Sequence, residues 1–137
     1  MLKRSSLVDS GALVALLDAR EEHHVWARET LTRQPTPWRT CESVVSEAFF
    51  LWPNAQAAAL DRLLRGQHLV ISLSLPEELD AVLALRAKYN DVPMSLADAC
   101  LVRMSEILPD PVIVTTDSDF RIYRRQCRQV VPCLFPR

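Results

Sequence analysis

The chain has 137 residues, of which 49% are hydrophobic, and its formal net charge at pH 7 is −1. Such a chain can bury the core of one domain, so we expect residues 1–137 to form a single domain. The balanced charge excludes a strongly basic nucleic-acid coat protein and an acidic disordered tail. The four cysteines form no C-x-x-C pair, and no run of roughly 18 apolar residues could cross a bilayer. We therefore expect reduced thiols, a cytoplasmic location and no membrane span.

Stretches with helical and extended apolar patterns alternate from one end of the sequence to the other. The strands are predicted over residues 5–9, 38–40, 69–71, 111–115 and 129–134. The helices are predicted over residues 11–18, 22–33, 42–51, 53–65, 76–90, 95–108 and 118–126. This alternation predicts an α/β/α sandwich around a central, mainly parallel sheet of four to five strands.

Two helices carry more specific local signals. Pro53 suits the first turn of the helix at 53–65, and Gly66 suits its end. In the helix at 76–90, Leu79 and Leu83 are one turn apart, which predicts that both belong to a buried face.

Four acidic residues are distributed over the predicted elements. Asp9 ends the first strand and Asp117 follows the strand VIVT, whereas Asp98 lies in the first turn of a helix. Glu47 lies within an otherwise apolar helix. Because α/β sheets carry their active sites at the carboxyl ends of the strands, where helices begin, we expect a shared acidic pocket there.

Taken singly, three of these acids have a structural interpretation. Asp9 can cap the helix that follows it, Asp98 can form a capping box with Ser95, and Asp117 can stabilise a turn. Glu47 is harder to explain in this way, because a carboxylate on a mostly buried helix is costly unless it is paired or bound to a metal.

A pocket of several carboxylates needs a counter-charge, because like charges repel and raise one another's pKa. A hard divalent cation such as Mg²⁺ or Mn²⁺ prefers oxygen ligands and bridges to phosphate oxygens. Such an ion can polarise a phosphate and activate water, so the chemistry requires no serine, cysteine or histidine nucleophile. The four acids therefore indicate metal-dependent phosphoryl chemistry.

Four segments of the chain resemble the PIN domain, in matching order. They are LVDSGALVALLD, SVVSEAFFL, SLADACLV and VIVTTDSDF. The resemblance covers nearly the whole chain, and it is greatest to the toxin component of bacterial VapBC toxin–antitoxin pairs. It implies a ribonuclease that hydrolyses RNA phosphodiester bonds with Mg²⁺ or Mn²⁺. The implied catalytic and metal-binding residues are Asp9, Glu47, Asp98 and Asp117, with Asp119 as an auxiliary metal ligand.

The resemblance also implies supporting residues and partners. Ser10 and Thr115 fall where hydroxyl groups would support the metal ligands. A homodimer is implied, together with a small antitoxin whose C-terminal peptide covers the pocket and often inserts an arginine. Helices within residues 11–33 and 42–65 would form the groove that receives the antitoxin.

A cluster of arginines follows Asp117. It comprises Arg121, Arg124, Arg125 and Arg128. On the helix predicted at 118–126 these side chains could hold the RNA backbone. A solvated helix face explains the cluster about as well.

The main alternative function is that of a catalytically silent PIN domain that binds protein or RNA. Two other classes with acidic pockets fit the residues poorly. A phospho-accepting receiver domain needs a lysine after a late strand, but the only lysines are Lys3 and Lys88. A phosphatase of the haloacid-dehalogenase type needs a second aspartate where Gly11 stands.

Overall fold

A parallel sheet of five strands forms the centre of the computed structural model, which describes residues 3–51 and 54–137. The strands are β1 (Ser5–Val8), β2 (Trp38–Thr40), β3 (Leu69–Ile71), β4 (Pro111–Val114) and β7 (Cys133–Leu134). Their order across the sheet is β3-β2-β1-β4-β7, and every neighbouring pair is parallel. The middle strand, β1, is paired with its neighbour β4 from Ser5 with Pro111 to Val8 with Val114.

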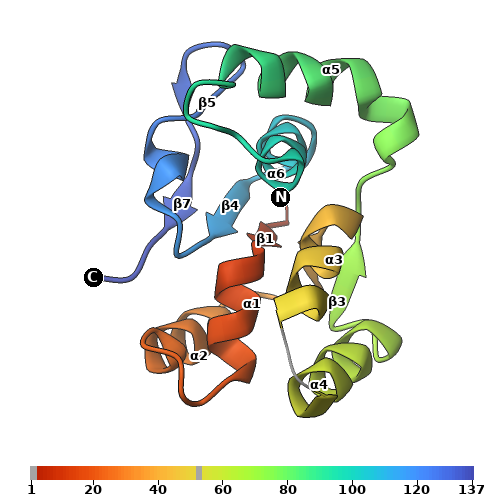
Figure 1. Cartoon of the computed structure of the whole chain (residues 1–137), viewed down its shortest axis with the longest axis vertical. Coiled ribbons are helices and arrows are strands. Elements are labelled where there is room, and N and C mark those ends of the chain that lie inside the picture. Colours follow the sequence, from red (N-terminus) through yellow and green to blue (C-terminus); the bar gives the residue numbers. More distant parts are fainter. Residues whose placement is uncertain (1–2, 52–53) are drawn as a thin grey trace.

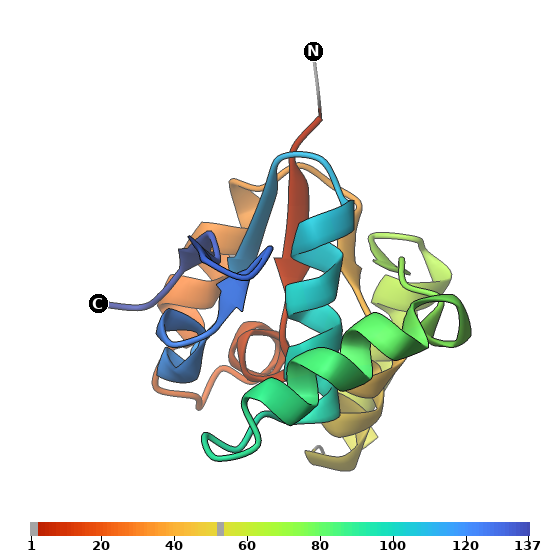
Figure 2. The same cartoon turned by 90° about the horizontal axis from the view of Figure 1, so that it is seen from above.

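Helices cover both faces of this sheet. They are α1 (Ser10–Leu17), α2 (His24–Thr32), α3 (Glu42–Leu51), α4 (Asn54–Arg65), α5 (Leu75–Lys88) and α6 (Leu96–Ile107). Helix α6 packs along β1 and β4 on one face and α5 packs outside α6, whereas α2 contacts β4 from the other face (Figures 1 and 2). The predicted α/β/α sandwich is therefore confirmed. Within the described residues, no helix is long and apolar enough to span a bilayer.

The two central strands are buried because helices lie on both sides of them. Ile113 and Val114 are fully buried, as the continuous apolar run of the sequence predicts for a strand covered on both faces. Polar side chains in the sheet have partners: the Thr40 hydroxyl donates to the Val8 carbonyl over 2.9 Å. Ser6 donates to Gln34 at the same distance, so these buried hydroxyls do not disrupt the core.

The C-terminal part of the chain differs from the prediction. The helix predicted at 118–126 is wrong, because only a short 3₁₀ helix, η1 (Ser118–Arg121), forms there. An antiparallel hairpin of β5 (Arg124–Arg125) and β6 (Gln129–Val130) follows, and only β7 joins the main sheet. The chain reverses between β5 and β6 through Gln126 and Cys127, whose φ angles of 47° and 69° are incompatible with a right-handed helix.

The prediction that Leu79 and Leu83 belong to a buried face is also wrong. Leu79 and Leu83 of α5 are 42% and 47% exposed. Helix α5 is the outermost element on its side of the sheet, so it buries only a narrow stripe that includes Val82 (Figure 2). The predicted start of a helix at Pro53 lies outside the described residues.

The end of α4 is also formed differently from the prediction. Gly66 does not take the left-handed conformation; Gln67 does, with φ 58°. The amide of the next residue, His68, donates back to the Leu63 carbonyl over 3.0 Å, which closes the helix.

We predict that Gln67→Gly stabilises the protein. Glycine adopts a positive φ without the contact between Cβ and the backbone that burdens other residues, so the free energy of unfolding should rise by about 1 kcal/mol. Chemical denaturation measures the difference. Gln129→Gly, in the extended strand β6, is the control and should not raise stability. An equal change in the free energy of unfolding of the two variants would contradict the prediction.

Candidate functional site

An acidic pocket of about 360 Å³ lies at the carboxyl ends of β1 and β4. Its polar lining comes from five carboxylates and three hydroxyl side chains, namely Asp9, Glu47, Asp98, Asp117, Asp119, Ser10, Ser95 and Thr116. Its apolar lining consists of Gly11, Val44, Pro93, Ala97 and Leu101. The structure thus brings all five predicted acids together. Among the residues that the structure describes, no lysine, arginine or histidine lines the pocket, so the negative charge has no protein counter-charge there.

Asp9 is the most buried of these acids. It ends β1 and caps α1, and its Oδ1 accepts a hydrogen bond from the Ala12 amide over 2.8 Å. Its Oδ2 accepts a hydrogen bond from the Thr115 hydroxyl. The structural interpretation of Asp9 as a helix cap and its position in the pocket are therefore both correct.

Thr115 connects Asp9 to the acids that follow β4. Its Oγ1 accepts from the Asp117 amide over 2.9 Å, and Asp117 Oδ1 in turn accepts from the Asp119 amide over 2.9 Å. Thr115 is fully buried and does not line the pocket. It therefore lies behind the acids and links the end of β1, at Asp9, to the segment that carries Asp117. This is consistent with the supporting position expected from the sequence.

Glu47 reaches the pocket from α3, but not for the reason that the sequence suggested. Its side chain is exposed, as are its neighbours Ser46 and Phe50, so the expected cost of burying this carboxylate does not arise. Helix α3 is apolar in composition but packs on the core mainly through Val44 and Ala48. The Ser10 hydroxyl donates to Glu47 Oε1 over 3.0 Å and so fixes Glu47 against the start of α1.

Asp98 projects from the first turn of α6. Ser95 caps this helix by accepting from the Asp98 amide over 3.0 Å, as the sequence predicted. Asp98 Oδ2 accepts a hydrogen bond of 2.9 Å from the hydroxyl of Tyr123, which is buried. Burial, together with the nearby Asp117, raises the pKa of Asp98 above its usual range.

Sequence reasoning missed two residues of this region, Thr116 and Tyr123. Thr116 lines the pocket beside Gly11, where any Cβ would collide with the Thr116 hydroxyl, so this position requires glycine or a shift of Thr116. Tyr123 bonds Asp98 from a distance of 25 residues. The pair of threonines after β4 was a signal for Thr116, but no spacing rule identifies Tyr123.

The electrostatics of the pocket are dominated by Asp9. Burial raises its pKa from the ordinary 3.8 to about 7, although the hydrogen bonds from Thr115 and the Ala12 amide act in the opposite direction. The charges of Asp117 and Asp98 raise it further. Without a cation, Asp9 of the folded protein therefore keeps its proton up to a pH of about 7, whereas an ordinary aspartate is ionised well below that pH.

The polar atoms of the pocket suit a hard cation. All of the polar side chains that line it offer oxygen, the ligand type that Mg²⁺ and Mn²⁺ prefer. Among the described residues, no three acidic, histidine or cysteine side chains are close enough to enclose a cation by themselves. Mg²⁺ commonly binds to one or two carboxylates and keeps several waters, so such an open arrangement fits it.

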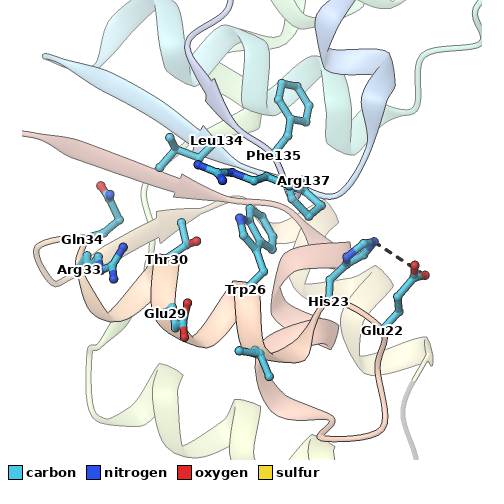
Figure 3. Close-up of a pocket in the computed structure, with 12 residues that line it drawn as sticks. Glu22, His23, Trp26, Glu29, Thr30, Arg33, Gln34, Leu134, Phe135 and Arg137 are labelled. Carbon is cyan, nitrogen blue, oxygen red and sulfur yellow. Dashed lines mark ion pairs between the residues drawn. The ribbon is translucent and has the colours of Figure 1, made fainter.

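A larger cavity of about 750 Å³ lies elsewhere and contains none of the predicted site residues. Figure 3 shows it between α2 and the C-terminal segment, with Trp26, Arg33, Phe135 and Arg137 among its lining residues. Its mixed lining of aromatic, acidic and basic side chains lacks the grouped carboxylates of the smaller pocket, which is therefore the better candidate for chemistry.

The arginines after Asp117 do not share one helix face. They lie on η1, on β5 and in the hairpin turn. The Arg121 guanidinium lies 3.9 Å from the centre of the Phe135 ring. Arg124 donates to three nearby backbone carbonyls, and Arg125 donates to the Ser105 carbonyl over 2.6 Å. RNA binding by this cluster stays a prediction.

In a comparison with known protein families, the chain matches the PIN domain over residues 6–126. The match covers most of the sequence, and the chain therefore belongs to the PIN domain family. PIN domains are typically nucleases and generally use divalent metals. No curated protein matches the sequence.

We predict that the metal-free protein becomes less stable as the pH rises from about 4 to about 7. Because the pKa of Asp9 is higher in the folded protein than its ordinary 3.8, the folded state binds more protons than the unfolded chain over this range. The associated loss in the free energy of unfolding is up to about 4 kcal/mol, and it is complete above the folded pKa.

Asp9→Asn tests this prediction, because asparagine keeps the shape of the side chain and cannot ionise. Denaturation is measured in chelator between pH 4 and pH 8. In the variant, the free energy of unfolding should lose most of its decrease with pH. The stability of the variant relative to the original chain should therefore increase as the pH rises. Parallel pH profiles of the two proteins would show that Asp9 does not carry this effect.

Proposed function

We propose that the protein is a metal-dependent endoribonuclease that hydrolyses RNA phosphodiester bonds at the acidic pocket. The observation that carries the proposal is the set of five carboxylates in one pocket without a basic side chain among the described lining residues. Such a group of acids is stable near neutral pH only with a cation or with bound protons. Because the chain belongs to a family whose members are typically nucleases, a bound cation is the better supported of the two.

Asp9, Glu47, Asp98 and Asp117 would hold Mg²⁺ or Mn²⁺, with Asp119 as an auxiliary ligand. When bound, the cation supplies polarisation of the phosphodiester group and a water of lowered pKa. Asp9 must lose its proton to bind the cation, which makes binding weaker at acid pH because the pKa of Asp9 is about 7 in the metal-free protein.

The remaining polar residues would fix the orientation of these acids. Thr115 donates to Asp9 and accepts from the Asp117 amide, so it keeps the ends of β1 and β4 in register at the pocket. Ser10 holds Glu47 by a hydrogen bond of 3.0 Å. Misplacing a reacting group by about 1 Å can slow a reaction on the order of 100-fold, so such contacts matter for the rate.

The experiment that tests the proposal is cleavage of a mixed RNA pool by the purified protein with Mg²⁺, Mn²⁺ or chelator. We expect metal-dependent cleavage, and we expect Asp98→Asn to reduce its rate by at least about 100-fold with folding intact. Asp80→Asn, which changes an exposed aspartate of α5, is the matched control and should keep the rate. Equal cleavage by all three proteins would refute the site.

The alternative of a silent PIN domain predicts a different result. In that case the folded protein would cut no RNA under any metal, and a divalent cation would give no rise in melting temperature.

We further propose that the protein is the toxin of a type II toxin–antitoxin pair and acts as a homodimer. Expression in a bacterial host should then arrest growth, and Asp98→Asn but not Asp80→Asn should relieve the arrest. The uncompensated acids of the pocket would attract an arginine from the antitoxin, in competition with the cation. An inhibitor affinity that is unchanged by saturating Mg²⁺ would contradict this mode of inhibition.

A further inference from the structure

Tyr123 contacts the acidic pocket from behind. It is fully buried and does not line the pocket, yet its hydroxyl donates to Asp98 Oδ2 over 2.9 Å. Its position is determined by the packing of its ring and by the segments on either side of it.

The ring of Tyr123 packs edge-on against two other aromatic rings. The centres of the Phe120 and Tyr89 rings are each 5.2 Å from its own. The Tyr89 hydroxyl accepts from the Arg124 amide over 3.0 Å, which attaches the residue after Tyr123 to the end of α5. The ring therefore has little freedom to rotate or withdraw from Asp98.

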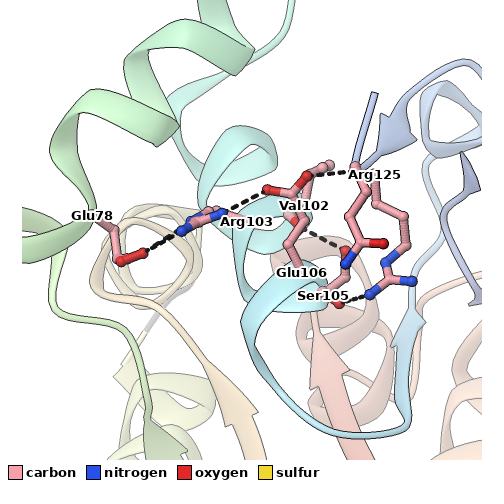
Figure 4. A network of polar contacts seen from close by, with 7 residues as sticks. Glu78, Val102, Arg103, Ser105, Glu106 and Arg125 are labelled. Carbon is pink, nitrogen blue, oxygen red and sulfur yellow. Dashed lines mark hydrogen bonds and ion pairs between the residues drawn. The ribbon is translucent and has the colours of Figure 1, made fainter. Parts of the chain in front are cut away.

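The hairpin that follows Tyr123 is attached to the far end of α6, the helix that carries Asp98 (Figure 4). The Gln126 amide donates to Glu106 over 2.6 Å, and Arg125 donates to the Ser105 carbonyl. Arg103 lies between Glu106 and Glu78 of α5, with contacts of 3.1 Å and 2.9 Å. The hairpin that follows Tyr123 is thus attached to α6, the helix that carries Asp98.

We propose that Tyr123 is a positioning residue, which holds one carboxylate oxygen of Asp98 so that the other is directed toward a divalent cation. This inference rests on the proposed metal-dependent function. A hydrogen bond to a ligating carboxylate commonly changes metal affinity 10- to 100-fold, roughly, when it is removed. A tyrosine that is merely part of the core would not have this effect when only its hydroxyl is lost.

The test is calorimetric titration of the metal-free full chain with Mn²⁺. Tyr123→Phe removes the hydroxyl and keeps the ring, and we expect it to weaken Mn²⁺ binding by about 10-fold or more. Tyr89→Phe is the matched control: it keeps its ring beside Tyr123 and loses a hydroxyl that bonds a backbone amide and not the Asp98 carboxylate, so Mn²⁺ affinity should fall much less than in Tyr123→Phe.

The outcomes separate the inference from the proposed function. Mn²⁺ binding to the original chain with equal affinity in Tyr123→Phe overturns the role of Tyr123 and leaves the nuclease proposal standing. No Mn²⁺ binding to the original chain overturns both. Equal weakening in Tyr89→Phe and Tyr123→Phe also overturns the inference, because it would assign the effect to packing.

A second measurement applies if Tyr123→Phe does not fold. Tyr89 and Tyr123 are the two tyrosines of the chain, so Tyr123 is the sole tyrosine in Tyr89→Phe. Addition of Mg²⁺ should change its ultraviolet difference spectrum, because the acceptor of its hydrogen bond becomes a metal ligand. A flat tyrosine band at saturating Mg²⁺ would overturn the inference.

Discussion

The burial of Asp9 beside other carboxylates is the constraint to which the rest of the pocket responds. Its carboxyl group is removed from water at the end of β1, and its two hydrogen bonds do not offset the loss of hydration, so its pKa rises to about 7. A lysine or arginine beside Asp9 would stabilise its charged form, but the described lining residues include neither. The raised pKa of Asp9 couples the stability of the protein to pH, and the proposed cation would compete with the proton on this carboxylate.

The parallel topology explains why distant acids meet. Since β1 and β4 are neighbours and run in the same direction, the residues that follow them emerge at one edge of the sheet. Asp9 and Asp117 are brought there by the strands themselves. Asp98 and Glu47 are brought there by α6 and α3, which contact each other beside the sheet. The sheet and two helices thus contribute acids to a single pocket.

The sequence predicted this architecture and the pocket's acids because their signals are local. Apolar runs defined β1 and β4, and the S-x-x-D pattern defined the start of α6. The sequence could not define contacts that depend on packing. The exposure of Glu47 is set by which face of α3 meets the core, and the bond from Tyr123 to Asp98 depends on a hairpin whose turn has two residues with positive φ. No periodic pattern encodes these features.

The hydrogen bond between Asp9 and Thr115 joins residues that are 106 positions apart. During translation, Asp9 and α1 leave the ribosome long before β4 has been made. Strand β4, which pairs with one edge of β1, and the Thr115 hydroxyl that holds Asp9 are both missing from any nascent chain that stops before residue 111. Fragments released by interrupted synthesis therefore lack β4 and the acids that follow it, and cannot assemble the acidic pocket.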